Sequence, residues 1–155
     1  MRAMPIGGAD ERSWAIVLAT GDDPMLALRS FAGQHQLQAS RFTGIGAFSD
    51  VVLGFFEWEK KDYRRIPLAE QVEVVSLIGD ITTWRDQPMV HAHVVVGRAD
   101  GSTMGGHLLE AHVRPTLEVM LVESPADLRR RWDPEAGLPL LDGHEPRISN
   151  TGLRP

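Results

Sequence analysis

HAHVVVGRADGSTMGGH, residues 91–107, holds half of the six histidines in this 155-residue chain and predicts a β-hairpin. Three valines follow His93, and β-branched runs favour strands. Side chains alternate between the two faces of a strand, so we expect His91 and His93 on the same face. Ala99-Asp100-Gly101 has the composition of a tight turn, and the second strand is expected to begin near Ser102 and to carry His107.

The length of this loop decides whether His107 can join the other two histidines. A two-residue loop at Asp100-Gly101 would pair Val94 with His107 and place His107 on the opposite face. A loop one residue longer, with Gly101 in the left-handed region, would pair His93 with His107. We therefore expect the longer loop, or an equivalent bulge at the Gly-Gly pair of the second strand, and all three imidazoles on one face.

Three clustered imidazoles suit a divalent transition metal, because neutral imidazole is a good ligand for such ions. Zinc is our first choice, with iron or nickel as alternatives, and three histidines with an open position are typical of catalytic zinc. The alternative to a metal site is that these are ordinary hydrogen-bonded histidines of the surface or core. The chain has no cysteine, so thiolate zinc sites, disulfides and a cysteine nucleophile are excluded.

Three carboxylates are candidates to assist these histidines. Glu73 and Asp80, on a predicted strand over residues 71–82, are expected partners that would orient the imidazoles. Glu110, and again Glu73, are the candidates for a general base if the site is catalytic. For each of them an exposed surface carboxylate is the commoner explanation.

The remaining pattern predicts an antiparallel α+β domain of about seven strands with one main flanking helix. Asp23 is expected to cap a helix that begins at Pro24 and ends near His35. We expect a turn at Ser49-Asp50 and an interruption of strand pairing at Arg114-Pro115. The other expected strands cover residues 13–19, 39–48, 51–58, 63–68 and 116–123.

Composition limits the classes of partner. The formal net charge of −5 gives no overall basic surface for nucleic acid. The dense basic run Arg129-Arg130-Arg131 is expected to be a solvated helix or loop. No apolar run is long enough to span a membrane and no secretory leader is evident, so we expect a cytoplasmic protein. We expect residues 1–12 to be a flexible lead-in, residues 13–137 a single domain, and residues 138–155 a poorly ordered tail.

The chain also resembles the PPC domain, the "plants and prokaryotes conserved" domain, also called PCC. The resemblance rests on TGIGAFSDVVLGFF (43–56), EVVSLIGDI (73–81) and above all HAHVVVGRADGSTMGGHLLEAHVRPTLEVML (91–121). It implies a compact antiparallel sheet with a flanking helix, assembled as a homotrimer. Family members with His-x-His followed by Gly-Gly-His form a three-histidine metal site, and His91, His93 and His107 stand at those positions.

Two classes of function follow. In plants the PPC domain accompanies AT-hooks, which bind the DNA minor groove through an Arg-Gly-Arg-Pro core that this chain lacks. The resemblance therefore implies a trimeric module with a DNA-binding or regulatory role. The fold and the trimer carry over to this chain more readily than DNA binding does, and partner proteins are a further expectation. The alternative is a small metal-dependent hydrolase or lyase that uses an open position on the metal.

Overall fold

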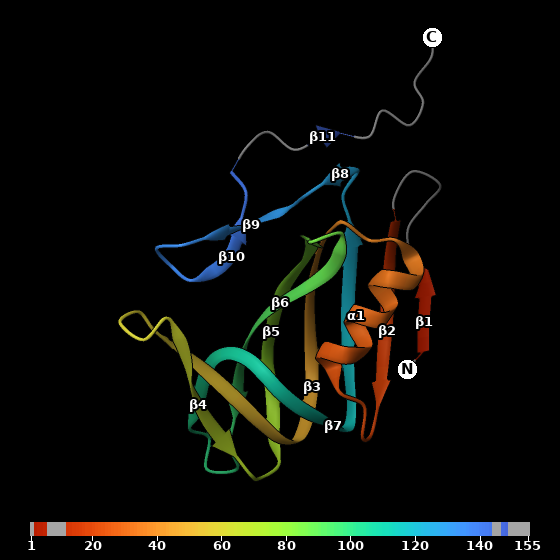
Figure 1. Ribbon diagram of the computed structural model, residues 1–155. Helices are drawn as coiled ribbons and strands as arrows, with labels where there is room; N and C mark the ends of the chain where they lie inside the picture. Colours follow the sequence, from red (N-terminus) through yellow and green to blue (C-terminus); the bar gives the residue numbers. More distant parts are fainter. Residues whose placement is uncertain (1, 6–11, 144–146, 149–155) are drawn as a thin grey trace.

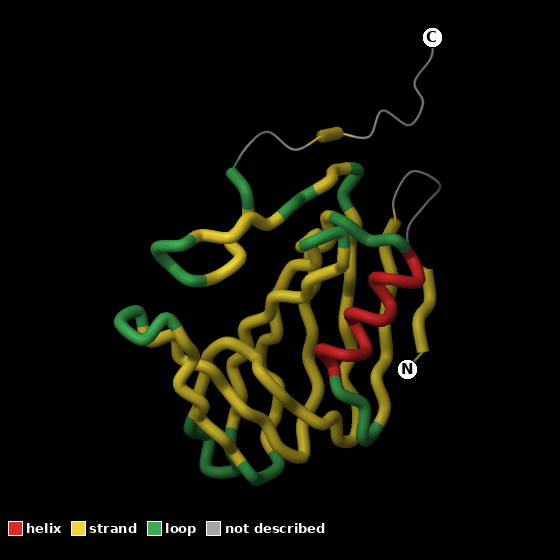
Figure 2. Tube along the Cα trace, in the orientation of Figure 1, coloured by secondary structure: helices red, strands yellow, loops and turns green. Residues whose placement is uncertain are grey.

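Strands dominate the part of the chain that the computed structural model describes, which is residues 2–5, 12–143 and 147–148. One helix, α1 (Pro24–His35), lies against the sheet (Figure 1, Figure 2). The strands are β1 (Arg2–Pro5), β2 (Arg12–Ala19), β3 (Ala39–Glu57), β4 (Asp62–Leu68), β5 (Val72–Trp84), β6 (Gln87–Gly97), β7 (Thr103–Glu123), β8 (Ala126–Asp127), β9 (Arg130–Asp133), β10 (Leu138–Leu141) and β11 (Arg147–Ile148).

The main sheet has the strand order β1-β2-β7-β6-β5-β3-β4, and its ladders are antiparallel. Strand β7 also pairs with β3, so β3, β5, β6 and β7 form a closed circuit of hydrogen-bonded neighbours. Six long strands and the short β1 make up this sheet, and β9–β10 and β8–β11 form two small sheets of their own. The expected class, a largely antiparallel sheet with one main helix, is confirmed.

The expected turn at Ser49-Asp50 is wrong, because β3 runs through it as one strand of 19 residues. The first half of β3 pairs with β5 and the second half with β4, so the chain bends where it changes partner. Polar groups at the bend bind to β7: the Asp50 carboxylate lies 2.8 Å from Nδ1 of His112. The bend therefore keeps its strand pairing instead of ending it.

The expected interruption of pairing at Arg114-Pro115 is confirmed, since neither residue has a ladder partner, although β7 itself continues through the proline as one strand of 21 residues. The register between β3 and β7 shifts here, from Gly46 opposite Leu117 to Phe48 opposite Val113. Proline lacks an N–H to donate, and a register irregularity is where a strand tolerates that loss.

The helix prediction is confirmed residue by residue. Asp23 is the N-cap, and its Oδ1 accepts hydrogen bonds from the backbone N–H groups of Met25 at 2.8 Å and Leu26 at 3.0 Å. Leu28 and Phe31 point into the same buried cluster as the inner face of the sheet. The face of the sheet that carries the histidines is the opposite one, because Ala92, Val94 and Val96, which alternate with them in β6, are buried.

Short strands occupy two segments that we expected to be irregular. Strand β1 pairs with β2 inside the expected lead-in, and β10 pairs with β9 at the start of the expected tail. Strand β11 is also described, whereas residues 144–146 and 149–155 of the expected tail lie outside the described residues. Among the described residues, no helix has the length and apolar character needed to cross a membrane.

Candidate metal centre

The loop between β6 and β7 has the longer of the two lengths considered from the sequence. The backbone N–H of Arg98 donates to the carbonyl of Ser102 at 2.8 Å, and the N–H of Gly101 donates to the carbonyl of Arg98 at 2.9 Å. Gly101 has a φ of 82°, in the left-handed region that glycine adopts without strain. His93 consequently pairs with His107 across the hairpin, and the predicted register is confirmed.

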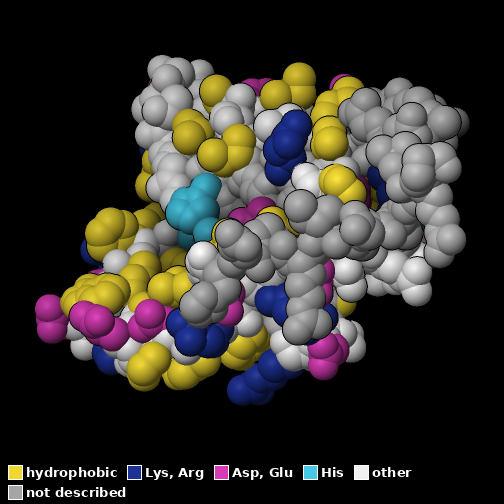
Figure 3. Space-filling view, turned by 90° about the horizontal axis from the view of Figure 1, so that it is seen from above, with side chains coloured by type: hydrophobic (Ala, Val, Ile, Leu, Met, Phe, Trp, Pro, Cys, Tyr) yellow, Lys and Arg dark blue, Asp and Glu magenta, His cyan; other side chains and the backbone are white. Residues whose placement is uncertain are grey.

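The three imidazoles form a nearly equilateral triangle on the outer face of the sheet. Their ring centroids are 5.2 Å apart for His91–His93, 5.2 Å for His91–His107 and 5.3 Å for His93–His107. One ring nitrogen from each lies within 4.8 Å of the others. His93 is exposed and the other two are half-buried, and histidine side chains reach the surface in the view from above (Figure 3).

His107 is the most enclosed of the three. Its ring stacks on Tyr63 of β4 with centroids 4.6 Å apart, and its Nδ1 is buried without a hydrogen-bond partner among the described residues. Burial, with smaller contributions from the nearby His91, His93 and Arg130, lowers the pKa of His107 to about 4. The ring is therefore neutral at pH 7, which is the form that binds metals.

His93 shows the same tendency, since burial and the neighbouring His91 hold its pKa below the usual range. Zn–N bonds of about 2.0–2.1 Å at tetrahedral angles place two ligand nitrogens about 3.4 Å apart. The nitrogens of the three rings lie within 4.8 Å of one another, so their separations are of the order that such a site needs. Three clustered imidazoles, with His93 and His107 held toward the neutral form, fit a divalent transition metal.

Asp80 lies beside the cluster, as expected from the sequence. It is the ladder partner of His91, and its Oδ2 is 3.4 Å from Nδ1 of that ring. Burial alone would raise the pKa of Asp80, but hydrogen bonds from His91 and Arg130 outweigh it and hold the pKa below its usual range. Asp80 is therefore an anion next to His91, the position from which a carboxylate can orient a metal-binding imidazole.

Sequence reasoning missed Arg130. Its side chain is only 6% exposed, and a terminal nitrogen donates to Oδ1 of Asp80 at 2.6 Å. The expectation that the whole Arg129–Arg131 run is solvated is wrong for this residue, because β9 turns it toward β5. Nothing local in the sequence marks the middle arginine of three as the buried one.

The two candidate general bases lie elsewhere. Glu73 pairs with Gly97, four residues beyond His93 in β6, and its side chain is exposed. Glu110 forms an ion pair with Arg65 at 2.7 Å, and both side chains are more than half exposed. Within the described residues, the group that could hold a metal contains the three histidines and no carboxylate.

Comparison with known proteins gives one family. Residues 6–125 match the Plants and Prokaryotes Conserved (PCC) domain. A protein from Bacteroides thetaiotaomicron, named for a proposed DNA-binding role, superposes with a TM-score of 0.86 at 27% identity, covering 93% of this chain and 98% of that one. A metal-containing protein from Archaeoglobus fulgidus superposes with a TM-score of 0.79 at 30% identity, covering 89% of this chain and 99% of that one.

Among curated proteins, the bifunctional protein GlmU of a Synechococcus strain is 30% identical over 139 residues. That match covers 88% of this chain but 21% of GlmU, so the chain spans about a fifth of the length of this relative.

Proposed function

The chain belongs to the Plants and Prokaryotes Conserved domain family, and on that premise we propose that it is a metal-binding module of the family. His91, His93 and His107 would hold one divalent transition metal ion, with zinc as the first choice. The observation that carries the proposal is the triangle of three imidazoles, one of which has a buried nitrogen without a hydrogen-bond partner in the part of the chain that the structure describes. The name of the Archaeoglobus relative, a metal-containing protein, supports it.

Metal content of protein purified without an affinity tag or chelator tests the proposal. We expect about one transition metal ion per chain in the wild type, and less than a tenth of that in the His91→Ala/His93→Ala double variant, which removes two of three ligands. The double variant should keep its circular dichroism spectrum, because both side chains reach the outer face and neither lies in the core. A wild type that neither contains metal nor takes up added zinc would refute the proposal.

We further propose that the module is a homotrimer that covers the outer face of the sheet. Large apolar side chains are exposed on that face, from 40% for Val95 to 61% for Ile45. The patch continues across three strands, because the exposed Ile78 on β5 and the exposed Met120 on β7 both lie opposite Thr43 on β3. An apolar patch of this kind on a sheet marks an interaction surface.

Light scattering at micromolar concentration should give the mass of three 17.1-kDa chains for the wild type. Ile45→Lys should weaken assembly at least tenfold, because it places a charge in the centre of the apolar patch. Leu26→Lys is the control, since Leu26 is 67% exposed but lies on α1, outside the patch. A monomeric wild type would reject the trimer.

A small metal-dependent hydrolase or lyase is the second candidate function. The exposure of His93 favours it, because a metal bound at an open surface keeps a coordination position for water or for a substrate carbonyl. The exposed Glu73 and Glu110 do not supply a general base near the imidazoles. Under this alternative, zinc-loaded wild type hydrolyses activated esters faster than the double variant described above, and equal rates would contradict it.

The DNA-binding role in the name of the Bacteroides relative is not part of our proposal. The only dense basic run has two of its three arginines engaged with carboxylates: Arg129 with Asp86 at 2.9 Å and with Asp127 at 2.8 Å, and Arg130 with Asp80. Neutralised arginines contribute little to phosphate binding, and the net charge of −5 opposes it.

A further inference from the structure

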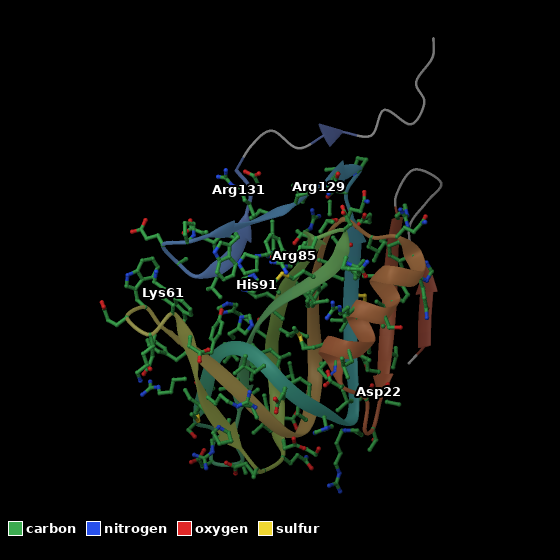
Figure 4. All side chains as sticks on the ribbon, in the orientation of Figure 1. Asp22, Lys61, Arg85, His91, Arg129 and Arg131 are labelled. Carbon is green, nitrogen blue, oxygen red and sulfur yellow. The ribbon has the colours of Figure 1, made fainter. Side chains whose placement is uncertain are left out.

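Arg130 connects the histidine site to a part of the chain that the family match does not include. The match ends at residue 125, whereas the β9–β10 hairpin spans residues 130–141. Figure 4 shows His91 beneath this hairpin. The guanidinium of Arg130 makes four hydrogen-bond contacts: from Nε to Oγ1 of Thr82 at 2.8 Å, and from its terminal nitrogens to the carbonyl of Pro139 at 3.2 Å, to Oδ1 of Asp80 at 2.6 Å and to Nδ1 of His91 at 3.3 Å.

The hairpin is held firmly enough to place this side chain. The backbone N–H of Thr83, in β5, donates to the carbonyl of Leu128 at 2.8 Å just before β9. At the other end, Nζ of Lys61 donates to the carbonyl of Pro134 at 2.9 Å, which ties the hairpin to the tip between β3 and β4 (Figure 4). Arg130 therefore approaches Asp80 from a strand anchored on both sides.

Asp80 uses its two oxygens for different partners. Oδ1 accepts from Arg130, and Oδ2 faces Nδ1 of His91 at 3.4 Å. Because Nδ1 of His91 faces this carboxylate, Nε2 is the nitrogen left for a metal. A metal-binding imidazole needs its proton on the other nitrogen, and a carboxylate acceptor fixes that tautomer and the ring orientation. A terminal nitrogen of Arg130 also lies 3.3 Å from the same Nδ1. Arginine can only donate, so this contact requires an unprotonated Nδ1 and competes with the contact to Asp80, which requires the protonated form.

We propose that Arg130 is a positioning residue for the metal centre: it orients Asp80, and Asp80 holds His91 with the proton on Nδ1 and Nε2 free to bind. The C-terminal hairpin is then a working part of the site. This inference rests on the proposed metal-binding function.

Three variants test it by zinc affinity, measured in competition with a chromophoric chelator. Asp80→Asn should weaken zinc binding 10- to 100-fold, and Arg130→Lys about tenfold, which is the range for groups that orient metal ligands. Lysine keeps the positive charge but cannot reach Asp80, Thr82 and Pro139 together. The variant therefore tests the hydrogen-bond geometry of the guanidinium while the charge stays the same. Arg131→Lys, at the exposed neighbouring position in β9, is the matched control and should bind as the wild type does.

A double-variant cycle tests whether Arg130 acts through Asp80. If it does, the Asp80→Asn/Arg130→Lys protein should bind zinc no more weakly than Asp80→Asn alone. Multiplicative losses would overturn the proposal, and so would zinc affinities within twofold of the wild type in both single variants. Melting temperatures of the metal-free proteins show whether each variant is folded.

A second readout needs no metal. Nitrogen-15 NMR of the metal-free wild type should show His91 with its proton on Nδ1, and the Asp80→Asn and Arg130→Lys variants should show increased population of the other tautomer. If the wild type fails to bind zinc, the proposed function fails, while the tautomer shift still supports the positioning role. A tautomer unchanged in both variants would overturn it.

Discussion

Replacing Gly79 with alanine is expected to lower the free energy of unfolding by about 3 kcal/mol, the upper end for forcing extra volume into a packed site. A Cβ at this position would lie 2.3 Å from Cζ of Phe42 and 2.4 Å from the backbone carbonyl oxygen of His91. Phe42 is a core residue only 2% exposed, and the carbonyl belongs to the adjacent strand, so neither can move aside cheaply. Gly79 pairs with Ala92, between the two histidines of β6, and the displacement should also weaken metal binding.

Gly33→Ala is the matched control for this variant. Nothing lies within 4 Å of a Cβ built on Gly33, which is inside α1. Alanine in a helix interior is favoured over glycine by about 0.5–1 kcal/mol, so this variant should be slightly more stable than the wild type. Urea unfolding of the metal-free proteins, with an unchanged dependence on denaturant, measures both effects. A loss below about 1 kcal/mol for Gly79→Ala would contradict the close packing described here.

Replacing His107 with leucine is expected to abolish metal-induced stabilisation without destabilising the metal-free protein. At zinc concentrations about a thousandfold above the dissociation constant, the wild type should gain about 4 kcal/mol in free energy of unfolding. The variant should gain none, because it lacks the ligand on the second strand. In the metal-free protein, Nδ1 of His107 is buried and has no hydrogen-bond partner among the residues that the structure describes, a state that costs about 1–3 kcal/mol. Leucine removes that cost, which outweighs the lost stacking of about 0.5–1.5 kcal/mol on Tyr63.

His112→Leu separates this effect from the general loss of a histidine. His112 is exposed and bound to Asp50 at 2.8 Å, outside the triangle. Its variant should keep the full stabilisation by zinc. Thermal unfolding with and without zinc measures both proteins. Retention of zinc binding by His107→Leu within tenfold of the wild type would show that the three histidines do not act as one site.

Much of the candidate site was accessible from the sequence because it is local. His91 and His93 share a face by the period of the strand, and the position of Gly101 sets the register that brings His107 opposite His93. Seventeen consecutive residues therefore specify the triangle. The position of Asp80 beside the histidines was only partly predictable. The sequence indicates that its strand is a neighbour in an antiparallel sheet, but not the register that places Asp80 opposite His91.

Other features were out of reach because they depend on contacts between distant segments. Turn-forming residues at Ser49-Asp50 predicted the end of a strand, but β3 continues by exchanging partners. Local composition cannot show that a partner strand will be present to maintain the pairing. The same limit applies to Glu110, whose carboxylate is taken up by Arg65 from β4.

The sequence by itself determined the class of the fold, the helix with its cap, and the three imidazoles on one face of a hairpin, because alternation, capping and loop length act over a few residues. Only the tertiary structure decided what surrounds those imidazoles. Tyr63 stacks on His107, and Arg130 reaches Asp80 from 50 residues away. These neighbours are set by how β4 and the C-terminal hairpin pack against the sheet, and that packing is a property of the whole chain, which no short pattern encodes.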